Sequence, residues 1–290
     1  LRHVLPVDEL AALRGQGRAH AAAHPGALAA TESAVAEDDV YTVIYTSGTT
    51  GAAKGCVITH RNYVAMTATI DALEVVFLPG DEMLLYLPLA HTFGRLMHLC
   101  GPYVGFTLAL LGDPQRLLDA VGTVRPTVIP SVPRLYEKVH AALSEKLATE
   151  QGAAGALLRW AMRTGAAAGE LRMRGQALPA GLALRHALAD RLVLHKVRDR
   201  LGGRVRICLS GGAPLSREVA LTLHAAGIVI LEGYGLTEGT AACSVNLPSA
   251  YRFGTVGRIL PGIEARLDGD GELLVRGPTV FAGYLDDPAA

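Results

Sequence analysis

The chain has 290 residues, half of them apolar, and its 27 basic residues balance 27 acidic ones. This length and composition are ample for a globular core in one large domain or two. The balanced charge offers no basic field that would attract nucleic acid or an anionic surface, so small-molecule partners are favoured. The four cysteines lie far apart with no CxxC spacing, which argues against a zinc site or a disulfide framework and fits a reducing, cytoplasmic compartment.

The N-terminal region gives no targeting signal. The first residue is Leu1 rather than Met, and no basic-then-apolar segment follows it, so we interpret the chain as a portion of a longer protein. Residues 1–36, rich in Ala and Gly, are predicted to be a connecting segment. Residues 96–111 carry no charge, but they are fewer than the ~20 residues that a membrane-spanning helix needs. We predict a buried helix and strand there.

Short apolar runs alternate with helical stretches along residues 37–250. This rhythm is typical of βαβ units, and it predicts an α/β fold of layered αβα subdomains with mainly parallel sheets. The expected strands cover residues 40–45, 82–88, 127–130, 205–210 and 228–231, and the expected helices include residues 62–76 and 216–226.

Two regions depart from this rhythm. Residues 137–204, rich in Ala, Leu and Arg, show helical spacing of apolar residues and predict an insertion of two or three amphipathic helices. Residues 251–290 predict the start of a small β-barrel-like subdomain. Within it, the Asp-Gly-Asp-Gly run at 268–271 is a better hairpin turn than a calcium loop, because the glycine and distal glutamate of an EF-hand are missing.

The densest chemical signal is the run from Tyr45 to Gly55, directly behind a predicted strand. Its glycines allow backbone N–H groups to approach an anion, its hydroxyl side chains add donors, and Lys54 adds a positive charge. The chain has only four lysines against 23 arginines, so a lysine in this run is less likely to occur there by chance. The run is not a Walker A loop, because Lys54 precedes Gly55 rather than Ser or Thr. A flexible Gly/Thr linker is the structural alternative.

Two further motifs follow predicted strands, where ligands of parallel sheets bind. Glu238 is suited to Mg²⁺, or is a solvated loop residue. Tyr234, between two glycines, could stack on a purine or pack in the core. The glycines at 211 and 212 permit close approach of a flat ligand, although a helix-entry turn explains them nearly as well. His91 is either a residue that lines the site or a structural histidine.

Taken in order, these motifs resemble the acyl-adenylate-forming superfamily. Residues 46–55 are similar to its Thr-Ser-Gly-Thr-Thr-Gly-x-Pro-Lys-Gly signature, with Ala53 where the family usually has proline. Residues 59–62, 233–238, 271–277 and 283–284 resemble the later motifs. Residues 87–95 and 131–137, with the long helical insertion that follows, resemble the long-chain fatty acyl-CoA synthetase branch.

This resemblance implies activation of a fatty acid by ATP to acyl-AMP, followed by transfer to coenzyme A. The residues it implies for Mg²⁺ are Thr46 and Glu238. For the phosphates they are Ser47, Gly48, Thr49, Thr50, Gly51 and Lys54. For the remainder of the nucleotide they are Gly211, Gly212, Ala213, Glu232, Gly233, Tyr234, Gly235, Leu236 and Thr237. His91 and Phe93 would line the acyl entrance, and Thr237, Glu238 and His91 would be the catalytic residues.

Several questions stay open at this stage. The acyl-adenylate could instead load a carrier-protein thiol, or the chain could be a non-catalytic nucleotide-binding fragment. We expect the family's C-terminal lid domain, with its lysine, and the ribose-binding aspartate to be absent, so that this chain binds ATP weakly and turns over poorly. Acyl chain length, oligomeric state and peripheral contact with the inner face of a membrane are not readable from the sequence.

Overall fold

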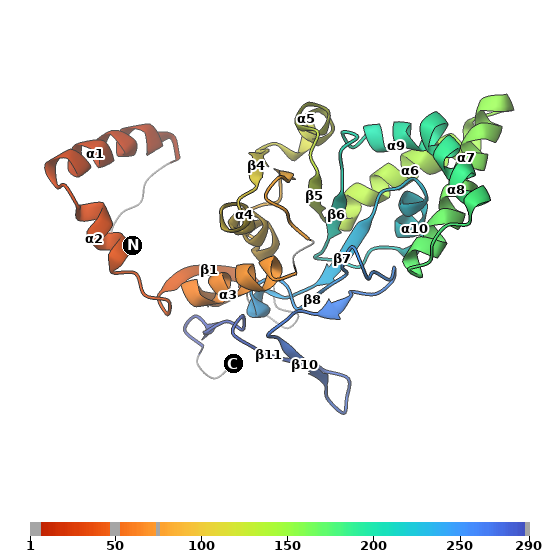
Figure 1. Cartoon of the computed structure of the whole chain (residues 1–290). Coiled ribbons are helices and arrows are strands. Elements are labelled where there is room, and N and C mark those ends of the chain that lie inside the picture. Colours follow the sequence, from red (N-terminus) through yellow and green to blue (C-terminus); the bar gives the residue numbers. More distant parts are fainter. Residues whose placement is uncertain (1–6, 47–52, 74–75, 288–290) are drawn as a thin grey trace.

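A computed structural model describes residues 7–46, 53–73 and 76–287, and its centre is a seven-stranded sheet (Figure 1). The strand order is β4-β3-β5-β6-β7-β8-β9. The strands are β3 (Glu82–Leu85), β4 (Thr107–Leu110), β5 (Val128–Ser131), β6 (Ile207–Ser210), β7 (Ile230–Tyr234), β8 (Ser244–Val245) and β9 (Arg258–Ile259). The pairs from β4 to β7 are parallel and the last two pairs are antiparallel. The predicted α/β class with a mainly parallel sheet is confirmed.

Helices cover both faces of this sheet because successive strand residues point to opposite sides. Ile129 of β5 and Cys208 of β6 belong to one buried cluster, and their neighbours Val128 and Ile207 belong to the other. The first cluster is closed by α5 (Leu117–Val124), α6 (Pro133–Thr149), α7 (Gly152–Met173) and α10 (Arg217–Ala225). The second is closed by α3 (His60–Asp71) and α4 (Thr92–Val104). The predicted helix and strand in residues 96–111 correspond to α4 and β4; the helix has a buried face, but the prediction of a buried strand was wrong, because β4 lies at the edge of the sheet and has no buried residue.

The predicted insertion is helical, but it contains more helices than the two or three expected. After α6 and α7 come α8 (Ala180–Ala189), a π-helical turn (Asp190–Leu194) and α9 (His195–Asp199). Helix α7 packs closely on α10, and glycine makes this approach possible. A Cβ at Gly165 would lie 1.9 Å from the carbonyl oxygen of Ala225, and one at Gly169 would lie 2.6 Å from Nδ1 of His224.

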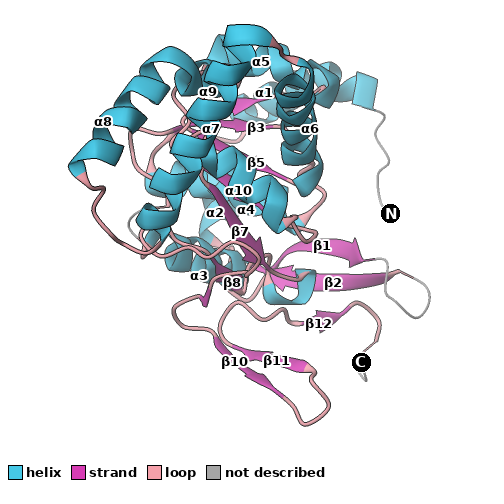
Figure 2. Cartoon of the chain, turned by 90° about the vertical axis from the view of Figure 1, so that its right-hand side faces the viewer, coloured by secondary structure: helices cyan, strands magenta, loops and turns pink. Residues whose placement is uncertain are grey.

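The predicted phosphate-loop strand lies outside the parallel sheet. Strand β1 (Val40–Thr46) pairs antiparallel with β2 (Lys54–Thr59), which the sequence analysis did not anticipate. Strand β12 (Gly283–Tyr284) adds to the other edge of β2, so these strands form a separate three-stranded sheet. Figure 2 shows this sheet and the β10–β11 hairpin on the same side of the helical body. We call β1 and β2 the phosphate hairpin.

The two ends of the chain differ in packing. Helices α1 (Leu10–Ala23) and α2 (Ala27–Ser33), after a 3₁₀ turn at Val7–Glu9, have no buried residues and extend away from the body (Figure 1). The helical form of this predicted connecting segment was not foreseen. Strands β10 (Glu264–Leu267) and β11 (Leu273–Arg276) form an antiparallel hairpin, which confirms the turn at residues 268–271. Among the described residues, no helix combines the length and apolar character needed to cross a bilayer.

Candidate functional site

The predicted motifs meet where the strands of the parallel sheet end. Residues 211–214 follow β6, and residues 233–238 include the end of β7 and the first two residues of the 3₁₀ turn Thr237–Gly239. The phosphate hairpin is linked to this turn through Tyr284, which bonds to Glu238 and pairs with β2. Strand ends in parallel sheets place loop side chains and free backbone groups at one edge. Segments that are far apart in the sequence thereby share one site. Ser47, Gly48, Thr49, Thr50 and Gly51 lie outside the described residues.

Thr46 and Glu238 both lie near the side chain of Cys56. This thiol is fully buried, and the two side chains are close enough to influence its pKa. Burial, together with the negative charge of Glu238, raises the pKa of the thiol to about 11. The thiol is therefore neutral at physiological pH.

The Glu238 carboxylate has a second partner from the C-terminal region. The hydroxyl of Tyr284 donates to its Oε1 at 2.8 Å, and the backbone N–H of Phe281 donates to the Glu238 carbonyl oxygen at 2.8 Å. The hydrogen bond to Glu238, with a smaller effect of burial, raises the pKa of Tyr284 to about 12. The phenol thus keeps its proton and remains a donor.

Lys54 lies over the ring of the same tyrosine. Its ammonium is 4.9 Å from the centroid of the Tyr284 ring and 3.1 Å from Oδ2 of Asp287. Lys54 and Thr46 are directly paired across the phosphate hairpin. A cation, a hydroxyl and a carboxylate thus converge around the mouth of the hairpin.

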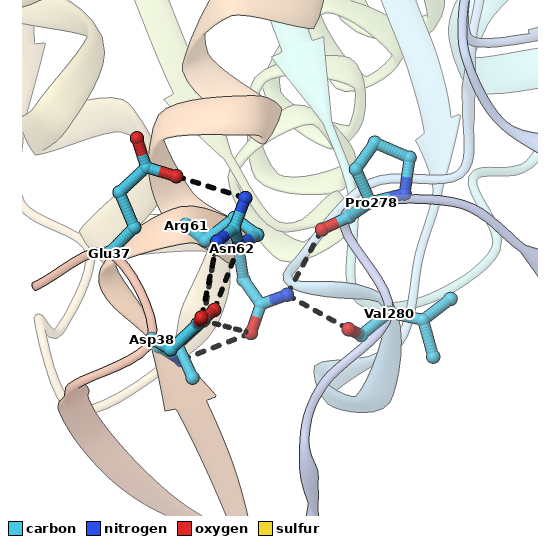
Figure 3. Close-up of polar contacts among 7 residues, drawn as sticks. Glu37, Asp38, Arg61, Asn62, Pro278 and Val280 are labelled. Carbon is cyan, nitrogen blue, oxygen red and sulfur yellow. Dashed lines mark hydrogen bonds and ion pairs between the residues drawn. The ribbon is translucent and has the colours of Figure 1, made fainter.

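Residues 278–287, which we call the strap, connect the phosphate hairpin to the turn that carries Glu238. Asn62 anchors the first part of the strap: its Nδ2 donates to the carbonyl oxygens of Pro278 (3.0 Å) and Val280 (2.8 Å) (Figure 3). The Oδ1 of Asn62 accepts from the backbone N–H of Thr59 at 3.0 Å, completing a capping box at the start of α3. One buried amide therefore fixes both the helix and the strap.

The strap then follows β2. The backbone N–H groups of Ala282 and Leu285 donate to the carbonyl oxygens of Val57 (3.0 Å) and Gly55 (2.8 Å). Beside Asn62, the guanidinium of Arg61 pairs with Asp38 and Glu37 (Figure 3). The hydrogen bond from Arg61, together with its positive charge, lowers the pKa of Asp38. This ion pair is exposed and contributes little to stability.

An apolar cavity of about 120 Å³ lies between the sheet and helices α3 and α4. The residues that line its apolar part include Ile70, Phe77, Phe93, Leu96, Met97 and Leu231. Gly211, Gly212, Tyr234 and Gly235 from the nucleotide motifs line the same cavity. Ser210 and Ser244 also line it, and their buried hydroxyls have no hydrogen-bond partner within the described part of the chain.

The glycines of the two motifs differ in why they are needed. A Cβ at Gly235 would lie 1.4 Å from the carbonyl oxygen of Ala241, which no side chain tolerates. A Cβ at Gly211 would meet the Phe93 ring at 3.5 Å, an ordinary contact, so this glycine keeps a slot open rather than avoiding a clash.

The remaining predicted residues are placed as follows. Glu232 is buried and its Oε1 accepts from the backbone N–H of Leu215 at 2.9 Å, which ties the loop after β6 to β7. Tyr234 is 42% exposed. His91 is exposed at the N-terminal end of α4 and is not among the residues that line the cavity, whereas Phe93 is. The role of His91 stays a prediction.

Sequence reasoning missed several residues of this site. Asn62 and Tyr284 were recognised only as parts of similar motifs, and Cys56 and Asp287 were given no role. The one available signal was that Gly283 and Tyr284 follow a β-rich segment. Nothing local indicated that the tyrosine would reach Glu238.

The backbone just after Glu238 is also unusual. Thr240 and Ala241 adopt left-handed conformations, with φ of 53° and 90°, which are costly for residues other than glycine. The hydroxyl of the buried Thr240 donates to the carbonyl oxygen of Thr279 in the strap at 2.6 Å. The strap therefore helps to hold the turn in this conformation.

The structure combines a layered α/β fold with a phosphate hairpin, a nearby carboxylate and an adjacent apolar cavity. These features are typical of a nucleotide-dependent enzyme, and sequence similarity to known proteins identifies the family. Residues 2–285 match the family of AMP-binding enzymes. The chain belongs to this family.

Individual relatives agree with this assignment. The chain is 38% identical over 269 residues to the long-chain-fatty-acid–CoA ligase FadD15 of Mycobacterium bovis, covering 92% of this chain and 44% of that protein. It is 38% identical to long-chain-fatty-acid–CoA ligase 1 of Homo sapiens, covering 88% of this chain and 37% of that protein. The chain thus spans less than half the length of these relatives.

Solved structures share the fold. A malonyl-CoA ligase in a ternary product complex with methylmalonyl-CoA and AMP superimposes with a TM-score of 0.62 at 25% identity, covering 88% of this chain and 47% of that one. ATP-bound MatB from Rhodopseudomonas palustris gives a TM-score of 0.60 at 26% identity, covering 88% of this chain and 42% of that one.

Proposed function

We propose that the protein activates a long-chain fatty acid with ATP to acyl-AMP and transfers the acyl group to coenzyme A, as an acid–thiol ligase. The observation that carries this proposal is the cavity lined jointly by apolar side chains and by the nucleotide motifs. Such a cavity sets an acyl chain beside a bound nucleotide, and each buried CH₂ contributes ~0.8 kcal/mol to binding. The names of the relatives, which are long-chain fatty acid ligases, support the same substrate class.

The donor set around Thr46 fits Mg²⁺. This ion prefers hard oxygen ligands and is commonly held by one or two protein groups together with substrate phosphates, and the Thr46 hydroxyl and Glu238 carboxylate both lie near the Cys56 thiol. The Oε1 of Glu238 accepts from Tyr284, and an ionised carboxylate keeps further lone pairs that could bind a metal. A bound Mg²⁺ would neutralise charge on the phosphates.

The roles of the protein's own residues follow from their positions. Lys54 would exchange its exposed contact with Asp287 for the phosphates, and Thr237 would approach the α-phosphate and the fatty carboxylate. The carboxylate oxygen forms a bond to the α-phosphorus as the bond to pyrophosphate breaks; the thiol of coenzyme A then displaces AMP and loses its proton. Orientation and charge neutralisation dominate such a reaction.

The test is ATP–pyrophosphate exchange with the complete protein across fatty acids from short to long, followed by product analysis. We expect exchange to require Mg²⁺ and to rise with chain length, and acyl-CoA to form when coenzyme A is supplied. If the acyl group is transferred only to a carrier-protein thiol, the acceptor is a carrier protein and not coenzyme A. Absence of exchange with every fatty acid would contradict the proposal.

Peripheral contact with an anionic membrane is the second part of the proposal. Leu184, Leu188 and Leu192 form one stripe along α8 and the π-helical turn, and they are 74%, 50% and 39% exposed. Exposed Arg185 and Arg191 flank this stripe. Apolar side chains with flanking cations match the interface of an anionic bilayer.

Sedimentation with vesicles tests this surface. We expect the protein to pellet with phosphatidylglycerol vesicles more than with phosphatidylcholine vesicles, and Leu184→Gln with Leu188→Gln to abolish the difference. Leu28→Gln on α2, which is 69% exposed, is the matched control. Equal binding by the double variant and the parent protein would exclude this surface.

A further inference from the structure

We propose that Tyr284 is a positioning residue for the metal and phosphate end of the site: its hydroxyl orients the Glu238 carboxylate and its ring positions Lys54. This inference rests on the proposed function, since it assigns Glu238 to a metal and Lys54 to phosphates. Tyr284 would touch neither the metal nor the phosphates, and it would act on them through Glu238 and Lys54.

The hydroxyl contact is well placed for orientation. Tyr284 donates to Oε1 of Glu238 at 2.8 Å, and the strap holds the Glu238 backbone through Phe281 at 2.8 Å. A carboxylate that is fixed by one hydrogen bond at the side chain and one at the backbone presents its remaining oxygen in a defined direction. Hydrogen bonds to charged groups are among the stronger ones.

The ring contact concerns Lys54. The ammonium lies 4.9 Å from the centroid of the Tyr284 ring, a distance at which the negative face of an aromatic ring attracts a cation. Asp287 holds the same ammonium at 3.1 Å. The ring and the carboxylate together restrict the flexible side chain of this lysine.

The backbone of Tyr284 is itself fixed. Tyr284 pairs with Cys56 across β12 and β2, and the adjacent Leu285 N–H donates to Gly55 at 2.8 Å. Cys56 in turn lies near Thr46 and Glu238. The tyrosine is thus attached to the same short stretch of β2 that carries Lys54, so its side chain couples the position of the hairpin to that of the carboxylate.

The experiment separates the two contacts with two variants. Tyr284→Phe removes the hydroxyl and keeps the ring, and Tyr284→Leu removes both. Mn²⁺ serves as a paramagnetic probe for Mg²⁺, and its binding to the protein–ATP complex is measured by electron paramagnetic resonance. ATP affinity without metal is measured by titration calorimetry.

We expect Tyr284→Phe to raise the Mn²⁺ concentration for half-saturation about three- to tenfold, the range that corresponds to one net hydrogen bond. ATP affinity without metal should not change. Tyr284→Leu should show the same metal defect and should also weaken metal-free ATP binding about threefold, because Lys54 loses its aromatic partner. In a Glu238→Gln background, Tyr284→Phe should have no further effect on Mn²⁺ binding.

Tyr251→Phe is the matched control. It removes a hydroxyl that bonds to Nε2 of His224 at 2.7 Å, on the far side of the sheet from the hairpin, and it should leave Mn²⁺ and ATP binding unchanged. Parental Mn²⁺ affinity in Tyr284→Phe, or an equal loss in Tyr251→Phe, would overturn the inference while the proposed function stands. Failure of the parent protein to bind ATP would overturn both.

Discussion

Replacing Asn62 with aspartate should release the strap from α3. The change is isosteric and preserves the acceptor for the Thr59 N–H, but it removes the Nδ2 donor from the carbonyl oxygens of Pro278 and Val280. A carboxylate oxygen would then face two carbonyl oxygens at about the distances of the present hydrogen bonds. Each buried acceptor left without a donor costs about 1–3 kcal/mol, so the free energy of unfolding should fall by about 2–6 kcal/mol.

Urea unfolding measures that loss, and hydrogen exchange locates it. The amides of Phe281, Ala282 and Leu285, which donate to Glu238, Val57 and Gly55, should lose protection before the parallel sheet does, because the strap opens locally.

Asn246→Asp is the matched control for this experiment. Asn246 donates to the carbonyl oxygens of Glu232 (3.1 Å) and Thr255 (2.6 Å), so the change has the same chemistry away from the strap. It should destabilise the protein without selective exposure of residues 281–285. Full protection of those amides in Asn62→Asp, or a loss of less than about 1 kcal/mol, would refute the reasoning.

Three shorter predictions follow from other parts of the structure. Burial lowers the pKa of His224 to about 4, whereas the unfolded chain takes up the proton near the ordinary pKa of ~6.5. The free energy of unfolding should therefore fall as the pH drops from that value toward 4. His224→Gln should flatten the dependence of the melting temperature on pH in this range. Gly235→Ala should destabilise the protein severely because its Cβ meets the carbonyl of Ala241, whereas Gly211→Ala should fold normally in circular dichroism and lose ligand affinity. Lys54→Met should weaken ATP binding in calorimetry while shifting the melting temperature little, because its exposed ion pair is worth at most ~1 kcal/mol.

The parallel sheet was predictable because its evidence is local. Strands such as β5 and β6 are short runs buried on both faces, and the helices between them have apolar residues at helical spacing, so each element shows its environment in its own sequence. The turn at residues 268–271 was predictable for the same reason, since its glycines and aspartates specify a hairpin regardless of distant contacts.

The phosphate hairpin was harder because its pairing is not local information. The run at 40–46 fits a parallel or an antiparallel strand equally well, and the βαβ rhythm around it favoured the parallel interpretation. Strand β2 was not predicted because Lys54 and Gly55 belong to a motif that is typical of a loop. Its second partner, β12, comes from the far end of the chain, and no pattern near Gly283 specifies which edge it joins.

The site shows the same division in its details. Thr46 and Glu238 were paired only through the resemblance to a known family, and their shared proximity to Cys56 depends on three separate chain segments. Propensity and periodicity describe one segment at a time, so they do not indicate which side chains meet when β2, the turn after β7 and the strap come together.

The strain next to Glu238 connects fold to function. Left-handed residues such as Thr240 and Ala241 cost about 1–3 kcal/mol each and persist only where surrounding contacts fix them. Here those contacts come from the strap, through Thr279 to Thr240 and through Phe281 to Glu238. Because the strap is also hydrogen-bonded to β2, it stabilises the strained turn and the phosphate hairpin together, and the position of the carboxylate is coupled to the position of the lysine.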